Sequence, residues 1–172
     1  NKNGQLDTKR LNKSKSTSEN MVALKALANS ETKYVFSTAS EYSSKEKSEL
    51  LVGDNCNGTK GVTLIPGAEV DPSPDNKVHI ITSNKLSAEK QASNTAHEGY
   101  AHAYFYELQQ QGHDVNPFHD YQSVLLGTEW NSEFNINVPI LGRDDKNEKL
   151  VKQIKTVEDQ AIRNFRSRRK NR

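Results

Sequence analysis

The chain has 172 residues, of which 33% are hydrophobic and 27% are charged, and its formal net charge at pH 7 is +2. This length predicts a single domain large enough to bury a core, and the near-neutral balance gives no overall signal for nucleic-acid binding. No apolar run is long enough to span a membrane, and the lone Cys56 excludes an internal disulfide and a cysteine-rich metal site.

The first 17 residues are polar and show no hydrophobic periodicity. We therefore expect a disordered arm or linker over 1–17, followed by one domain over 18–172. A short helix with Ser18 as its N-cap, a strand over 34–36 and another short helix over 44–51 are expected next.

Two segments further along are better strand candidates, because β-branched residues dominate 61–65 and 77–82. The residues between them are rich in proline, glycine, aspartate and asparagine, so the two strands are expected to pair as neighbours. We expect 78–82 to be an edge strand beside an active-site helix, where an extended peptide substrate can pair with it.

Two helices are predicted in the second half of the chain. The first begins after Ser87 as N-cap and ends at Gly112. The second follows Asp145, which forms a capping-box pattern with Glu148. Its apolar residues recur every three or four positions, at Leu150, Ile154, Val157, Ala161 and Phe165. Strands followed by helices indicate an α+β fold.

The most informative motif lies on the first of these helices, where residues 97–102 read H-E-G-Y-A-H. Zinc peptidases commonly carry H-E-x-x-H, with both histidines on one helical face and the glutamate as general base. Here His102 comes one residue late, and positions five apart on a regular helix differ by roughly 140°. His97 and His102 can share one metal only if a π-bulge widens the helix between them.

The spacing predicts a catalytic zinc site with an open position for water. His97 and His102 supply two ligands, and Glu98 is the general base for a water that zinc activates. Two acids four apart, Glu129 and Glu133, follow on a plausible helix, where one could ligate zinc and the other support a ligand histidine. Other candidates for the third ligand are His113, His119 and Asp120, and candidate donors for transition-state stabilisation are Tyr121, His119 and Tyr106.

The two motifs together resemble the dipeptidyl peptidase III type of zinc peptidase, whose helix carries H-E-x-x-G-H and whose next motif reads E-E-x-x-A-E. This chain has Ala101 in place of the glycine, and its second motif over 128–133 reads T-E-W-N-S-E. The resemblance implies that Glu129 is the third zinc ligand and that Glu133 supports the site from outside the ligand shell. It covers about a dozen residues of a much longer family, so it transfers the zincin-like site and not the fold.

A second resemblance extends from 61–69 through the histidine motif to 116–121, which reads N-P-F-H-D-Y. This stretch is similar to the C-terminal toxin domains of RHS-type bacterial polymorphic proteins, many of which have an H-E-x-Y-G-H-A core. The chain has Tyr100 and Ala103 in register. The resemblance implies a metallopeptidase effector, secreted or delivered into a target cell, with a protein or peptide substrate and a cognate immunity protein. The start at Asn1, without methionine, fits a tail released from a larger carrier.

Less specific interpretations stand beside these. A nuclease-type toxin could bind the phosphates of nucleic acid with a basic C-terminal tail. No nuclease motif accompanies this tail, so nucleic acid is not the expected partner. A zincin-like scaffold without activity could act by binding alone. His79 is expected to face solvent or a hydrogen-bond partner, and Trp130 is expected to belong to the core. The basic residues of the tail are Arg163, Arg166, Arg168, Arg169, Lys170 and Arg172.

Overall fold

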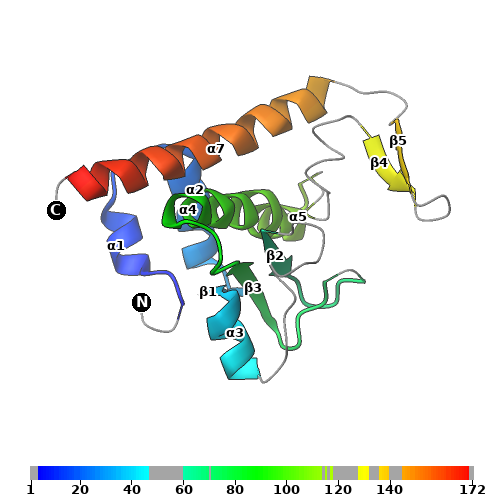
Figure 1. The fold of residues 1–172 in the computed structure, drawn as a ribbon, viewed down its shortest axis with the longest axis horizontal. Coiled ribbons are helices and arrows are strands. Elements are labelled where there is room, and N and C mark those ends of the chain that lie inside the picture. The colour runs from blue at the N-terminus through cyan, green and yellow to red at the C-terminus, as the bar shows by residue number, and fades with distance from the viewer. Residues whose placement is uncertain are drawn as a thin grey trace.

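The computed structural model describes residues 4–46, 60–69, 71–113, 115, 117, 128–131, 136–139 and 145–170, and over 44–46, 128–131, 136–139 and 145–151 it describes the backbone. The fold is α+β, with a small sheet, helices packed against it and a long C-terminal helix lying across them (Figure 1). The elements in chain order are α1 (Thr8–Lys13), α2 (Glu19–Asn29), β1 (Lys33–Thr38), α3 (Ala39–Glu46), β2 (Gly61–Leu64), β3 (Lys77–Thr82), α4 (Ala88–His97), the π-helix η1 (Glu98–Tyr104), α5 (Phe105–Gln110), β4 (Thr128–Asn131), β5 (Ile136–Pro139) and α7 (Asp145–Lys170).

The main sheet has the strand order β1-β3-β2, with β3 parallel to β1 and antiparallel to β2. The predicted pairing of the segments 61–65 and 77–82 is therefore confirmed. The expectation that 78–82 forms an edge strand is wrong, because β3 is hydrogen-bonded on both sides. The strand that lies at the edge of this sheet and faces the histidine helix is β2.

The N-terminal residues differ from the expected disordered arm. Asp7 caps α1 by accepting a hydrogen bond from the Arg10 backbone, and the Thr8 hydroxyl donates to the carbonyl of Ala28 at the end of α2. The segment before α1 also pairs with β1, since the Phe36 amide donates to the carbonyl of Gly4. This pairing covers the outer edge of β1, which a polar composition alone does not reveal.

The two faces of the sheet pack against different helices. Because side chains alternate along a strand, β3 sends Val78 and Ile80 to one face and Ile81 to the other. The first face meets α2, η1 and α5 through Leu27 and Ala103, whereas the second meets α3 through Ala39, Tyr42 and Leu64. The histidine helix is thereby held against a fully packed surface.

The helical segments carry the predicted termini. The Ser87 side chain accepts a hydrogen bond from the Lys90 amide at the start of α4. Gly112 follows α5 with a φ of 86°, a left-handed conformation that favours glycine and ends the helix. Among the residues that the structure describes, no helix is long and apolar enough to cross a membrane.

The C-terminal helix α7 packs along α4 (Figure 1). Ile154 and Val157 are fully buried in a cluster with Ala96 and Ala101 of the histidine helix. Near its end, the guanidinium group of Arg166 donates two hydrogen bonds to the carboxylate of Glu89, at 2.5 and 3.0 Å. The predicted C-terminal helix is confirmed, and one of its basic residues is engaged in docking it.

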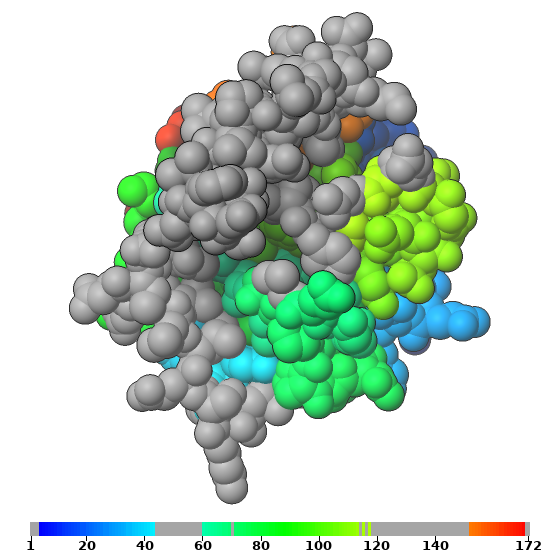
Figure 2. Space-filling view, turned by 90° about the vertical axis from the view of Figure 1, so that its right-hand side faces the viewer, coloured from blue at the N-terminus to red at the C-terminus, as the bar shows by residue number. Residues whose placement is uncertain are grey.

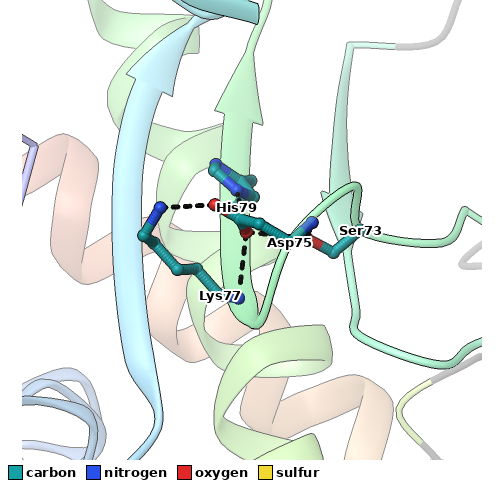
Figure 3. A network of polar contacts seen from close by, with 4 residues as sticks. All are labelled: Ser73, Asp75, Lys77 and His79. Atoms are coloured by element: carbon teal, nitrogen blue, oxygen red, sulfur yellow. Dashed lines mark hydrogen bonds and ion pairs between the residues drawn. The ribbon is translucent and has the colours of Figure 1, made fainter.

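A polar network fixes the turn into β3 (Figure 3). Asp75 accepts hydrogen bonds from the Lys77 amide at 3.0 Å and from the Lys77 ammonium group, and its Oδ1 lies 2.9 Å from Nε2 of His79. The His79 ring is buried and packs edge-on against Tyr42. Of the two environments expected for His79, the structure shows the hydrogen-bond partner, Asp75, and the ring does not face solvent.

The network predicts a pH-dependent contribution to stability. Burial alone would raise the pKa of Asp75, but the hydrogen bonds from Lys77 and His79 outweigh it and lower this pKa to about 2. A carboxylate whose pKa is lower in the folded state stabilises the fold above its unfolded pKa of about 3.9 and loses that contribution as pH falls toward 2. We expect Asp75→Asn to lower the melting temperature at pH 6.

The variant keeps the shape of the side chain and the oxygen that accepts from the Lys77 amide, while it removes the charge and replaces Oδ2, which accepts from the Lys77 ammonium group, with an NH2 group. Thermal unfolding of both proteins between pH 6 and pH 2.5 should show a difference that narrows below about pH 4. A difference that stays constant over this range would contradict the assignment.

Candidate metal centre

The π-helix η1 brings His97 and His102 together. In a π-helix the hydrogen bonds run from residue i to i+5, so residues five apart lie close to one face. The centroids of the two imidazole rings are 5.3 Å apart. The π-bulge expected from the late histidine is confirmed, with η1 spanning Glu98–Tyr104.

Small residues allow this wide turn to pack closely. Ala101 and Ala103 are fully buried. A Cβ atom on Gly99 would lie 3.3 Å from Cε1 of Phe36, which is tighter than an ordinary van der Waals contact. The helix can therefore widen at the motif without being pushed away from the sheet.

Three potential ligand atoms converge at this point. One atom from each of His97, Glu98 and His102 lies within 4.8 Å of the other two, and Nε2 of His102 is 4.0 Å from Oε2 of Glu98. His97 and Glu98 are buried, while His102 is partly exposed. The cluster thus opens toward solvent on the His102 side.

Both imidazole rings are oriented by hydrogen bonds at Nδ1. Nδ1 of His102 lies 2.7 Å from the carbonyl oxygen of Pro117, which can only accept, so this nitrogen carries the proton. Nδ1 of His97 lies 2.9 Å from Oε1 of Glu158 on α7. Nε2 is therefore the nitrogen that each ring can present to a metal, and the partners at Nδ1 fix the orientation of the rings.

Glu158 was missed by sequence reasoning, although a signal was present. It follows Ile154 by four positions and precedes Ala161 by three, so it lies on the apolar stripe of α7. An acidic residue on a buried stripe needs a partner. His97 is that partner, at a sequence separation of 61 residues.

The side chain of Glu98 connects η1 to the edge strand β2. Its side chain is buried, and Oε2 accepts a hydrogen bond of 2.9 Å from the hydroxyl of Thr63 on β2. Burial raises the pKa of Glu98 to about 7, although the neighbouring His97 and the hydrogen bond from Thr63 act in the opposite direction. A carboxyl group with a pKa near neutrality can take up and release a proton at physiological pH.

The approach of the helix to β2 depends on Gly61. A Cβ atom at this position would lie 2.1 Å from Nδ2 of Asn94 and 3.1 Å from Cγ of Glu98. Asn94 and Glu98 are one helical turn apart, and Gly61 and Thr63 are two residues apart on β2. The helix therefore lies along the edge strand, with Asn94 beside Gly61 and Glu98 beside Thr63.

Two other predicted residues, His113 and Tyr106, are described and lie outside this cluster. His113 is exposed after α5, and Tyr106 packs against the core around Leu27. The backbone of Glu129 lies in β4, which pairs antiparallel with β5, so the helix expected over 128–133 is wrong for 128–131. The predicted residues that lie outside the described part are His119, Asp120, Tyr121 and Glu133.

The donor set fits zinc. Neutral imidazoles are preferred zinc ligands, and both rings here are held at Nδ1 as ligand histidines usually are. Two atoms that each lie about 2.0–2.2 Å from one ion are at most about 4.4 Å apart. The observed separations of up to 4.8 Å need only small side-chain rotations to meet this limit.

Comparisons with protein-family models, with curated proteins and with solved structures find no match to this chain.

Proposed function

We propose that this chain is a zinc-dependent peptidase that hydrolyses peptide bonds with Glu98 as general base. The observation that carries the proposal is the π-helix, which aligns His97 and His102 beside Glu98 while both Nδ1 atoms are hydrogen-bonded. A histidine displaced by one residue would be incompatible with a shared metal on a regular helix.

The residues have distinct roles in this proposal. His97 and His102 bind zinc through Nε2, and when bound, zinc supplies a Lewis acid and an activated water at neutral pH. Glu98 accepts the proton, and Thr63 holds its carboxylate in place. Glu129 is our candidate for the third ligand, on the strength of the motif resemblance, with Glu133 as its support. Glu158 orients His97.

A peptide is the substrate that the edge strand favours. β2 lies beside Glu98, and extended peptides add to sheet edges through backbone hydrogen bonds. We further propose, from the resemblance to RHS-type toxin domains, that the chain acts as an effector delivered from a larger protein and restrained by an immunity protein. A nuclease is less well supported, because Arg166 of the basic tail is already paired with Glu89.

Elemental analysis of the purified protein tests the metal site. We expect about one zinc per chain in the wild type and in Glu98→Gln, and loss of zinc in His102→Ala. Glu158→Gln should fold and bind zinc with roughly 10- to 100-fold lower affinity, because the hydrogen bond at Nδ1 of His97 loses its charge.

Hydrolysis of a mixture of quenched-fluorescent peptides of random sequence then tests the reaction. Zinc-dependent cleavage in the wild type supports the peptidase. Bound zinc without cleavage would favour a zincin-like scaffold that acts by binding. A wild-type protein that takes up no zinc even after reconstitution would overturn the proposal.

A further inference from the structure

The exposed surface of α7 carries only cationic and uncharged polar side chains. Over 152–170 no exposed side chain is acidic and none is apolar, and the two acids of this stretch, Glu158 and Asp159, are partly buried. From 163 to 170 the helix has cations and no acid. The exposed residues over 152–170 are Lys152, Gln153, Lys155, Thr156, Arg163, Asn164, Arg166, Ser167, Arg168, Arg169 and Lys170.

Several of these cations take no part in holding the described fold together. Arg166 is paired with Glu89 of α4 and so helps to dock the helix. A helix dipole favours cations near its C-terminus, but this effect falls off within the last turn and does not account for cations two turns earlier. The cations that make no hydrogen bond or ion pair with the described part of the chain are Arg163, Arg168 and Lys170.

The chemistry of this surface favours the phosphates of a nucleic acid over a membrane or a protein. A helix that binds a membrane surface inserts an apolar face, and the apolar side chains of α7 are turned inward, with Ile154 and Val157 buried and Phe165 partly buried. A protein interface has an apolar or aromatic core, which the exposed residues over 152–170 lack. Arginine and lysine, interspersed with asparagine, glutamine, serine and threonine, are the side chains that contact phosphate oxygens.

The same residues favour a duplex over a single strand. Proteins that bind single strands without sequence preference stack the bases on aromatic side chains, and no aromatic side chain is exposed over 152–170. The stretch from Arg163 to Lys170 is about 10 Å long. A duplex carries one negative charge per about 1.7 Å of its axis, so several phosphates lie within reach of this stretch.

We propose that the end of α7, from Arg163 to Lys170, is a nucleic-acid-binding surface that contacts the phosphate backbone of a duplex without reading its sequence. This differs from the expectation, based on motifs and overall charge, that nucleic acid is not a partner. The net charge of +2 averages the cations of this surface with acids elsewhere in the chain.

The surface is separate from the candidate metal centre. Glu89, which pairs with Arg166, precedes His97 by eight positions on α4, a distance of about 12 Å along the helix. The inference therefore does not depend on the proposed peptidase function.

Fluorescence anisotropy with short DNA and RNA duplexes tests the surface. We expect the wild type to bind at least one of them with an affinity that falls about 10²-fold between about 50 and 200 mM salt, the dependence for four phosphate contacts. The duplex that binds more tightly identifies the source of the phosphates. Polyglutamate is the probe for an acidic protein as the partner.

Arg163→Gln and Arg168→Gln should each weaken duplex binding roughly 10-fold at about 50 mM salt and reduce the logarithmic salt slope by about 1, because each removes one phosphate contact. Adding Lys170→Gln to both should reduce the slope by about 3. All three side chains are exposed, so the melting temperature should not change by more than a few degrees.

Lys33→Gln is the matched control for the single variants, because it also removes one exposed positive charge. Lys33 begins β1, and the start of this strand, blue in Figure 2, lies on the face seen from the right-hand side of Figure 1. The end of α7 lies at the opposite, left-hand end of Figure 1. Lys33→Gln should therefore keep both the affinity and the salt slope of the wild type.

Failure to bind either duplex at about 50 mM salt, or binding that the α7 variants leave unchanged, would overturn the proposal. Tighter binding of polyglutamate than of both duplexes, weakened by the same variants, would also overturn it and would assign the surface to an acidic protein. His102→Ala should bind the duplexes as the wild type does, so that the outcome for this surface is independent of the outcome for the metal site.

Discussion

Glu98→Gln should lower the turnover number for peptide hydrolysis by about 10²- to 10⁴-fold, which is the usual contribution of a general base. Glutamine has the shape of glutamate, and its amide oxygen can still accept the hydrogen bond from Thr63. The variant cannot take up the proton. We therefore expect a folded protein that retains zinc, shows an unchanged melting temperature within a few degrees and cleaves the random peptide mixture barely above background.

Glu89→Gln provides the control, because Glu89 lies on the same run of helix but is partly exposed and pairs with Arg166. Exposed ion pairs contribute little to stability, so this variant should keep full activity. If Glu98→Gln retained more than a tenth of the wild-type turnover, Glu98 would not be the base. If it also lost zinc, Glu98 would be a ligand instead, which the 4.0 Å separation from His102 makes geometrically conceivable.

The π-helix was predictable because its signal is local. His97 and His102 cannot bind the same metal ion on a regular helix, so their spacing requires the helix to widen. The widening needs only the small residues that the motif supplies. The signals for the two ends of this helical segment were equally local, because Ser87 and Gly112 act on the backbone next to them.

The features that sequence reasoning missed depend on residues far apart in the chain. The position of β3 in the sheet is decided by β1, whose pairing with it could not be read from 77–82 alone. Glu158 reaches His97 across 61 residues. Hydrophobic periodicity shows which face of an element is buried and does not show what it is buried against.

Ile154→Ala should lower the free energy of unfolding by about 2–5 kcal/mol, the range for truncating a buried isoleucine. Ile154 is fully buried against the histidine helix. Ile154→Val should cost about 0.5–1.5 kcal/mol. Lys155→Ala, at the exposed neighbouring position, should change stability by no more than about 0.5 kcal/mol. Urea unfolding of the four proteins in a zinc chelator measures these differences.

The same series shows whether the docking of α7 and the metal centre are coupled. Zinc that binds only the folded protein raises its stability by an amount that depends on the affinity. Ile154 lies one turn before Glu158, so a cavity at position 154 should loosen the hydrogen bond at Nδ1 of His97 and weaken zinc binding. The stabilisation that zinc adds should then be smaller in Ile154→Ala than in the wild type, and unchanged in Lys155→Ala. Equal stabilisation in all of them would mean that Glu158 holds His97 independently of how α7 packs, and that the helix serves the core and the metal centre as two separate functions.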